Sequence, residues 1–569
     1  MVKTKKEKKP LTKGKKIVKR IFQAIGLIFL IALALFIIFF GKMFYGFAYK
    51  SLDTGYKTVD VKLTTEQKLK DFEYMYRLVC LDNPRKELFE ESYGISYDDV
   101  YKKYRNLVEN SQSEFEFFAY MSSFLAALPG SHNNMTLPNY PGFCADASFG
   151  LSYIYGTQEM KDYTYSWTEV FREDVKKYSQ IKPILFYYVD GKYITHEASG
   201  SPLVNETYAG GQIISLNGKD PKDMCFEFFE RFTPTYDKEH NCYFRKILML
   251  NDTMGTKYTA EILMPDGKII TADLYDDPRV DIAFFDGMST YRDLFLPAKK
   301  TSETKEAETA ETTTDVSAPA SYRIVKDASR KLVYLDLLSC LKEEGDRLAE
   351  DLQKALDEVN AESVILDIRE NGGGNAQLAY EYLLPVLFSH DVEFTPRIVG
   401  KLNEHNRKFD NAFYRLTGVF HNMEKKDGYY YYNDFFSVKG EAKRNYKIYV
   451  LTSQTTFSTA DIITALCKEY DNAVVIGTNT GGEGIGGVAL NCILPESHFA
   501  FVYVGTVNEK FPEDGIKGID PDIYCGRTLD EYYRSKELDK QGTDSGSYEV
   551  RQTWDGALIK ALKMIDNKE

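Results

Sequence analysis

Residues 363–374 read Ser-Val-Ile-Leu-Asp-Ile-Arg-Glu-Asn-Gly-Gly-Gly, and this stretch decides the fold. Its apolar start predicts a buried strand, and its three glycines predict a tight loop before a helix at 375–387. Further strands are expected at 331–338, 447–452 and 473–477, and further helices at 345–359 and 458–470. This alternation is typical of a largely parallel α/β sheet covered by helices on both faces, with reactive groups at the strand ends.

Two of the loops that join a strand to a helix hold candidate reactive groups. The glycines at 372–374 allow backbone N–H groups to approach a ligand and form an anion-binding concavity, although a tight turn explains a glycine triplet equally well. Ser458 stands at the start of a predicted helix, where the helix dipole favours a developing oxyanion. Ser458 with Asp461 also fits a capping box, and spacing alone favours this simpler role.

Several motif classes are excluded. The glycine-rich stretch 481–487 leads into a strand-like segment rather than a helix, so it does not fit a dinucleotide-binding loop. No GxxxxGK[ST], HExxH or GxSxG motif occurs, which removes P-loop, zincin and α/β-hydrolase interpretations. The eight cysteines are widely spaced without a CxxC pair, so we expect neither a metal nor another cofactor.

The charge distribution is uneven along the chain. Residues 1–20 contain ten Lys or Arg and a single acidic residue, whereas the whole chain contains 71 Lys or Arg and 84 Asp or Glu. The acidic body argues against nucleic-acid binding, which depends on neutralising phosphates. Residues 21–41 carry no charge and are long enough to cross a hydrocarbon core of about 30 Å. The basic flank then predicts a cytoplasmic N-terminus and an extracellular body, with a cleaved signal peptide as the alternative.

Upstream of the α/β pattern, three helical stretches follow one another between about 60 and 128. Each begins with a capping pair: Thr64 and Gln67, Ser96 and Asp99, Ser113 and Glu116. Pro129 and Gly130 stop the last helix and leave Ser131 and His132 on a loop. From about 145 the pattern changes to short strands and turns, including an Asn-Gly turn at 217–218 and a hairpin around 265–267.

The predicted organisation comprises seven segments. They are a cytoplasmic basic tail at 1–20, a transmembrane helix at 21–41, an N-terminal helical domain at 60–140, a β-rich region at 145–295, a flexible linker at 296–321, an α/β catalytic core at 322–530 and a helical tail at 531–569.

Taken together, these motifs resemble the tail-specific, or C-terminal processing, serine protease family. Residues 363–374 are similar to its strand and glycine loop, 457–461 and 473–477 to its nucleophile helix and next strand, and 518–522 (Gly-Ile-Asp-Pro-Asp) to its closing signature. The resemblance implies a crotonase-like α/β core preceded by a helical bundle. It also implies that the β-rich region is PDZ-like, a module that captures peptide ends by adding a strand to a sheet edge.

The resemblance also distinguishes two branches of that family. In the processing-protease branch the base is a lysine 25 residues after the nucleophile, and this chain has Glu483 there. Gly130-Ser131-His132 instead matches the Gly-Ser-His element of the branch that includes the tricorn core protease and the retinoid-binding protein of the retina. The implied nucleophile is Ser458 and the implied base His132, with Ser131 assisting.

The remaining site residues are also implied by the resemblance. The N–H groups of Gly373, Gly374 and Thr459 would form the oxyanion hole. Glu513 is the preferred acid to orient the histidine, with Asp514 and Glu483 as alternatives.

The expected function is a membrane-anchored, extracytoplasmic serine endopeptidase that cleaves polypeptides through an acyl-enzyme. The alternative is a catalytically inactive relative that binds a peptide or another ligand at the cell surface, because a fold does not secure an activity. The sequence does not indicate the oligomeric state.

Overall fold

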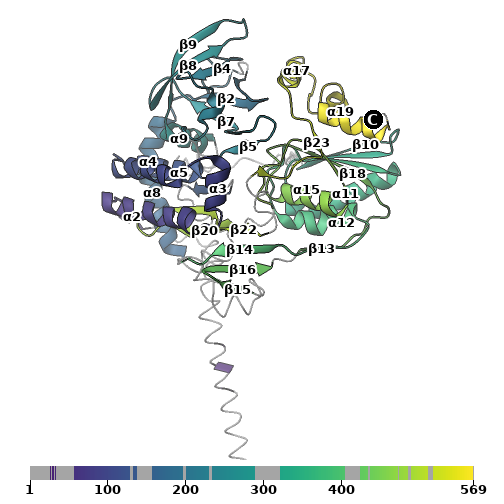
Figure 1. Ribbon diagram of the computed structural model, residues 1–569, viewed down its shortest axis with the longest axis horizontal. Coiled ribbons are helices and arrows are strands. Elements are labelled where there is room, and N and C mark those ends of the chain that lie inside the picture. The colour runs from purple at the N-terminus through teal and green to yellow at the C-terminus, as the bar shows by residue number, and fades with distance from the viewer. Residues whose placement is uncertain are drawn as a thin grey trace, which may run out of the picture. The chain divides into compact units, whose positions relative to one another are not determined.

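A computed structural model of the chain is shown in Figure 1. The described residues are 26, 29–30, 33, 57–128, 132–136, 157–196, 200–229, 233–288, 321–403, 423–433, 436–471, 473–484, 489–509 and 517–567. They divide into two compact units, 1–61 with 137–169 and 62–136 with 170–569. Within the first unit, the Lys57 N–H donates to Asp162 at 2.8 Å and the Val59 N–H to the Ser166 hydroxyl at 3.0 Å. Apart from residues 157–169, the features described below belong to the second unit.

A six-stranded sheet forms the centre of the α/β region. Its order is β10 (Tyr322–Asp327), β11 (Leu332–Leu337), β12 (Ser363–Asp367), β18 (Lys447–Thr452), β19 (Val474–Gly477) and β23 (Ile523–Tyr524). β12 is buried along its whole length, which explains its continuous apolar sequence. All pairs from β11 to β23 are parallel and β10 is antiparallel to β11, so the prediction of a largely parallel sheet is confirmed.

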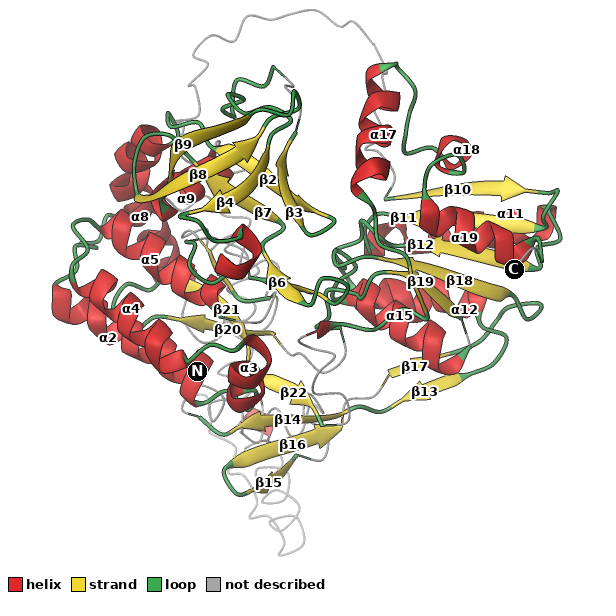
Figure 2. Ribbon diagram, turned by 45° about the horizontal axis from the view of Figure 1, so that its top comes forward, coloured by secondary structure: helices red, strands yellow, loops and turns green. Residues whose placement is uncertain are grey.

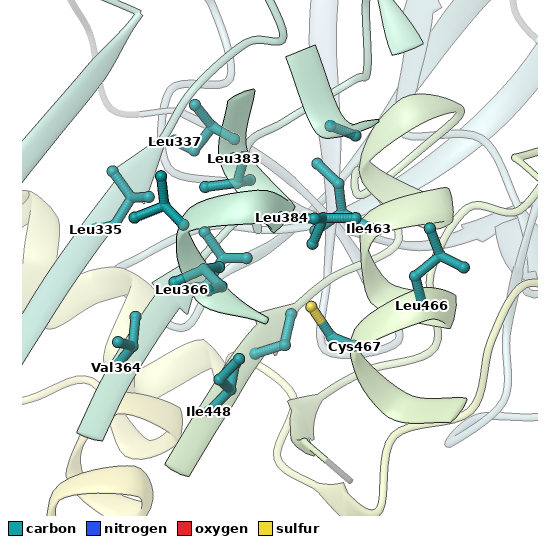
Figure 3. Packing of buried hydrophobic residues seen from close by; sticks show 14 of the residues in the cluster. Leu335, Leu337, Val364, Leu366, Leu383, Leu384, Ile448, Ile463, Leu466 and Cys467 are labelled. Carbon is teal, nitrogen blue, oxygen red and sulfur yellow. The ribbon is translucent and has the colours of Figure 1, made fainter. Parts of the chain in front are cut away.

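Helices pack against both faces of this sheet. One face is covered by α11 (Gly345–Glu358), α12 (Leu384–Leu387), α15 (Thr459–Tyr470) and the π-helical turn η4 (Leu378–Leu383), and the other by α19 (Gly556–Ile565). Figure 3 shows Leu366 and Ile448 of the sheet beside Ile463 and Cys467 of α15. A single helix at 375–387 was expected; the structure has η4 followed by α12 instead.

The N-terminal helices are α2 (Thr65–Tyr76), α3 (Lys86–Tyr93), α4 (Tyr97–Glu109) and α5 (Glu114–Ala127). The capping box at Thr64 is present and Ser113 caps α5, but Ser96 makes no side-chain capping bond, so that part of the prediction is wrong. After α5, the short strand β1 (Asn134–Thr136) pairs with β21 (Ala500–Val504), which also pairs with β20 (Ala489–Ile493). His132 thus lies in the chain between a buried helix that ends at Ala127 and a strand that begins at Asn134.

The β-rich region folds into a second six-stranded sheet, visible in Figure 2, in which every pair is antiparallel. Its order is β7 (Ile247–Leu250), β2 (Ile184–Val189), β3 (Lys192–Thr195), β4 (Gln212–Leu216), β8 (Thr256–Leu263) and β9 (Ile269–Asp276). Asn217 follows β4 with a positive φ of 51°, as the predicted Asn-Gly turn requires. The helices α8 (Thr157–Tyr178) and α9 (Pro278–Met288) were not expected in this region.

The other described elements are η1 (Arg77–Leu81), η2 (Pro221–Met224), β5 (Thr235–Asp237), β6 (Cys242–Phe244), η3 (Lys342–Glu344), β13 (Val392–Phe394), β14 (Arg397–Lys401), β15 (Glu424–Lys426), β16 (Tyr429–Asn433), β17 (Phe436–Val438), β22 (Thr506–Asn508), α17 (Leu529–Lys540) and α18 (Tyr548–Arg551).

Three predicted segments lie wholly or almost wholly outside the described residues. They are the basic tail at 1–20, the membrane span at 21–41, of which four residues are described, and the linker at 296–321, apart from its last residue. Among the residues that the structure describes, no helix has the length and apolar character needed to cross a bilayer.

Candidate active site

Ser458 lies in the loop between the carboxyl end of β18 and α15, in an unusual backbone conformation. Its φ of 55° and ψ of −118° fall in a region that a residue with a Cβ enters only when its surroundings hold it there. Its N–H donates to the carbonyl of Gly482 at 3.1 Å, and its carbonyl accepts from Ile462 at 3.0 Å. These two bonds fix the main chain and leave the hydroxyl to another partner.

The capping box expected between Ser458 and Asp461 does not form. The Ser458 side chain makes no capping hydrogen bond. Asp461 instead accepts from the N–H of Gly484 at 3.0 Å and from the hydroxyl of Thr480. The simpler structural role for Ser458 is therefore wrong, because its hydroxyl is not used by the helix.

His132 joins Ser458 to a carboxylate. Its Nε2 lies 3.2 Å from Ser458 Oγ, and its Nδ1 lies 2.8 Å from Glu483 Oε2. The backbone N–H of His132 donates to the same carboxylate oxygen at 3.1 Å. The imidazole packs against the ring of Phe457 with 4.7 Å between centroids, and its side chain is 26% exposed. The loop histidine and the helix-start serine, 326 positions apart, are thus brought into hydrogen-bonding distance.

The carboxylate that contacts His132 is Glu483, which the sequence ranked below Glu513. Glu513, Asp514 and Ser131 lie outside the described residues. Glu483 occupies the position, 25 residues after Ser458, at which the processing-protease branch would have its lysine. That shared position was the signal available in the sequence for preferring Glu483.

Glu483 is a buried charge with two cationic or polar partners. Its side chain is 1% exposed, and its Oε1 lies 3.3 Å from Nη1 of Arg85, which is 2% exposed. Burial alone would raise the pKa of Glu483, but the hydrogen bonds from His132 and the charge of Arg85 hold it below its ordinary value. Glu483 is therefore ionised at neutral pH. Sequence reasoning missed Arg85, because no motif marks an arginine before a helix as part of a distant site.

The loop that carries Glu483 is fixed onto the start of α15. The Gly481 N–H donates to the carbonyl of Thr456 at 2.7 Å, and a Cβ at Gly484 would lie 2.5 Å from the carbonyl oxygen of Ser458. Glu483 itself has a positive φ of 58°. The glycines around Glu483 are thus needed for close approach to the helix rather than for binding a nucleotide.

The predicted oxyanion donors differ in availability. The N–H of Gly373 already donates to Asn371 Oδ1 at 2.8 Å, so its expected role is not supported. Thr459 follows Ser458 at the first position of α15. Neither the N–H of Thr459 nor that of Gly374 has an acceptor among the described residues. The Thr459 hydroxyl donates to the carbonyl of Gly374 at 2.8 Å, which keeps the two loops together.

A serine, a histidine and a buried carboxylate in one hydrogen-bonded line are the arrangement of a serine-type hydrolase. Residues 331–525, which include Ser458 and Glu483, match the family model described as peptidase family S41. The chain is accordingly a serine-type peptidase, and its residues 331–525 are similar to the peptidase family that the sequence motifs resemble. No curated protein matches the sequence.

The chain is also similar to a number of solved structures, among them the following three. Mature CPAF complexed with lactacystin is 14% identical, with 88% of this chain and 99% of that chain covered and a TM-score of 0.48. The photosystem II D1 C-terminal processing protease is 14% identical, with 82% and 94% covered and a TM-score of 0.36. The tricorn protease is 13% identical, with 88% and 37% covered and a TM-score of 0.29. All three scores are below 0.5, so the assignment depends on the family match and on the side chains of the site.

Proposed function

We propose that the protein is an endopeptidase that cleaves polypeptides through an acyl-enzyme, with Ser458 as nucleophile, His132 as general base and Glu483 as the orienting acid. The observation that carries this proposal is the pair of contacts of His132, 3.2 Å to Ser458 Oγ and 2.8 Å to Glu483 Oε2. On this basis the protein functions as a Ser-His enzyme rather than a Ser-Lys enzyme.

The carboxylate determines which nitrogen of His132 carries the proton. An ionised carboxylate only accepts hydrogen bonds, so the Nδ1 that faces Glu483 must be the protonated nitrogen of the neutral ring. Nε2 then presents its lone pair to the hydroxyl of Ser458. This is the tautomer that a general base needs, because serine is a weak nucleophile until a neighbour accepts its proton.

The reaction then follows from these positions. Ser458 Oγ attacks the carbonyl carbon of the peptide bond while its proton passes to His132 Nε2. The tetrahedral intermediate collapses, the C–N bond breaks, and Nε2 gives the proton to the departing amine. Water then attacks the carbonyl carbon of the resulting ester while one of its protons passes to Nε2. The C–O bond to Ser458 breaks, Nε2 returns the proton to Ser458 Oγ, and the carboxylic acid is released. Glu483 stabilises the imidazolium during both steps.

The developing oxyanion would be bound at the start of α15. The Thr459 N–H directly follows the nucleophile and lies at the positive end of the helix dipole. The Gly374 N–H is the second candidate donor, from the loop held against Thr459. Donors of this kind lower the barrier because they are already oriented before charge develops.

Two further parts of the proposal come from the sequence. The sheet that contains β2, β3 and β4 would be a PDZ-like module that recruits the polypeptide, beside a crotonase-like catalytic core. Residues 21–41 would anchor the chain in the cell membrane as a single-pass segment, with the peptidase outside the cell. Retention of the full-length chain in membranes washed with alkaline carbonate, and its release when 1–41 are deleted, would test the anchor.

The catalytic proposal is tested with a fluorophosphonate probe on the folded protein. We expect one label, located by mass spectrometry on the peptide that contains Ser458, and no label in Ser458→Ala or His132→Ala. Ser329→Ala removes an exposed hydroxyl that donates to Asp327 at 2.5 Å, and this control should label like the wild type. Labelling that persists in Ser458→Ala would contradict the proposal.

A further inference from the structure

The buried pair formed by Arg85 and Glu483 links the N-terminal helices to the active site. Arg85 precedes α3, whereas Glu483 lies in the loop after β19, and their side chains are 2% and 1% exposed. Among the described residues, Glu483 is the single carboxylate within ion-pair distance of Arg85, and Arg85 Nε has no acceptor. Each buried charge therefore depends on the other for its compensation.

The two donors that converge on Glu483 are set on one scaffold. Asn83 accepts from the Arg85 N–H at 2.9 Å, and its amide donates to the carbonyl of Val504 in β21 at 3.2 Å. Asn133, which follows His132, accepts from the N–H of the same Val504 at 3.2 Å. Both polar groups of one strand residue are thus held by the neighbours of Arg85 and His132, which fixes the spacing of these two side chains.

The two carboxylate oxygens of Glu483 are divided between these partners. Oε2 receives both bonds from His132, at 2.8 and 3.1 Å, and Oε1 receives the Arg85 bond at 3.3 Å. Rotation of the carboxylate would break at least one of these contacts. The guanidinium is itself held over the ring of Phe89 at 4.9 Å, so it cannot readily follow such a rotation.

We infer that Arg85 is a positioning residue of the peptidase, which keeps Glu483 ionised and turned toward His132. This inference rests on the proposed catalytic roles of Ser458, His132 and Glu483. The N-terminal helices would then supply both the general base and the counter-charge of the acid that orients it. An arginine suits this role because its guanidinium stays charged at every working pH.

The inference predicts a change in the pH profile. Without Arg85, burial is opposed only by His132, so the pKa of Glu483 rises and the carboxylate takes up a proton at higher pH. Among the described residues, Tyr93 of α3 and Tyr97 of α4 also face this pair, and burial raises the pKa of both hydroxyls well above the ordinary value, so both stay neutral. The acidic limb of kcat/KM should therefore move to higher pH.

The experiment compares Arg85→Gln and Arg85→Lys in the full-length protein with a fluorogenic peptide substrate. For Arg85→Gln we expect the acidic limb, which belongs to the coupled site rather than to Glu483 alone, to rise by about 0.5 pH unit or more, up to the roughly 1–3 units by which an adjacent cation lowers a carboxyl pKa. Arg85→Lys keeps the charge, so its limb should stay within a few tenths of a pH unit of the wild type, whatever its loss of kcat.

A matched control is Arg245→Gln. Arg245 is also buried, at 1% exposed, but its Nε donates to the carbonyl of Cys225 at 3.0 Å and it makes no contact with Glu483. This variant should lower the melting temperature without moving the limb, which separates a lost buried arginine from a lost counter-charge. If Arg85→Gln does not fold, the inference is tested with Arg85→Lys and Arg85→Met instead. It is supported if the acidic limb of kcat/KM stays at the wild-type pH in Arg85→Lys and moves to higher pH in Arg85→Met.

An unshifted limb in folded Arg85→Gln, or an equal shift in Arg245→Gln, would overturn the inference. The proposed peptidase function is tested separately, by the activity of Ser458→Ala. If Ser458→Ala still hydrolyses the substrate, the proposed function fails; if Ser458→Ala is inactive and the limb of Arg85→Gln is unmoved, only the role of Arg85 fails.

Discussion

Replacing Glu483 by glutamine tests how the charge at the centre of the site acts. Three N–H donors, two from His132 and one from Arg85, converge on the two carboxylate oxygens at 2.8–3.3 Å. A glutamine offers one oxygen and one amide group. If the oxygen faces His132, the amide N–H groups face the Arg85 guanidinium; in the opposite orientation they face both donors of His132. Either orientation places donor against donor in a buried space.

Two magnitudes follow from this geometry. Loss of the carboxylate removes the group that fixes the His132 tautomer and stabilises the imidazolium, and equivalent changes in serine peptidases lower kcat by about 10⁴. The same change leaves Arg85 as a buried charge without its counter-charge, which costs about 3–5 kcal/mol of folding free energy. We therefore expect Glu483→Gln to fold with a lower melting temperature and to lose about three to four orders of magnitude in kcat.

The assay is steady-state hydrolysis of a fluorogenic peptide together with the rate of fluorophosphonate labelling and a urea denaturation curve. Glu496→Gln is the matched control, because Glu496 is a carboxylate near the end of β20 that bonds to exposed Lys70, and its loss should leave kcat within about twofold. If Glu483→Gln keeps more than a tenth of the wild-type kcat, the Glu483 carboxylate does not have the proposed role in catalysis. If its urea midpoint equals that of the wild type, Arg85 does not depend on Glu483 for its counter-charge.

Three other predictions concern the surroundings of the site. Gly373→Ala should lower kcat at least 100-fold, because Gly373 has a φ of 98° and an added Cβ would lie 2.8 Å from the Cβ of Ser458. Gly372 has open space around it, so Gly372→Ala should leave kcat almost unchanged in the same assay. Burial raises the pKa of Asp71 from 3.8 to about 6, so between these pH values the native state holds a proton that the unfolded state has released. The free energy of unfolding therefore falls as the pH rises from about 4 to about 6. In Asp71→Asn, urea curves at pH 4.5 and 6.5 should no longer show this difference in stability. Asp555→Ala should destabilise the protein by about 2–4 kcal/mol in a urea curve, because Asp555 both caps α19 and pairs with Arg369 at 2.7 Å; an unchanged midpoint would contradict this.

The central sheet could be predicted because its strands are buried on both faces. β12 and β18 therefore appear in the sequence as short, almost wholly apolar runs, each followed by a helix. The helix α8 was missed for the opposite reason. Tyr163, Tyr165 and Trp167 alternate with polar residues as in a strand, and the helical period emerges only from the buried set Trp167, Phe171, Val175 and Tyr178. Because the aromatic residues of this segment fit both a strand period and a helical period, tertiary packing determines which of the two structures forms.

The candidate site was predictable to the extent that local sequence encodes it. The serine at a strand-to-helix junction and the histidine after a helix stop both have local signals. The choice of Glu483 over Glu513 has one signal in the sequence, the spacing of 25 residues between Ser458 and Glu483. The contact with the histidine itself depends on how the loop at 481–484 bends back onto α15 through bonds to Thr456 and Asp461, and local sequence patterns do not indicate that bend.

The buried pair of Arg85 and Glu483 is a physical argument for the proposed Ser-His mechanism and against a serine–lysine dyad at this position. A lysine needs a lowered pKa to act as a base, and a nearby cation does lower it; however, a lysine at position 483 would lie next to the buried guanidinium with no carboxylate to compensate either charge. The glutamate reverses this relation, because it compensates Arg85 and accepts the Nδ1 proton of His132 at the same time. In the proposed mechanism, the position that would hold the base in the processing-protease branch thus orients the base instead. That exchange requires a histidine from the N-terminal helices to complete the site.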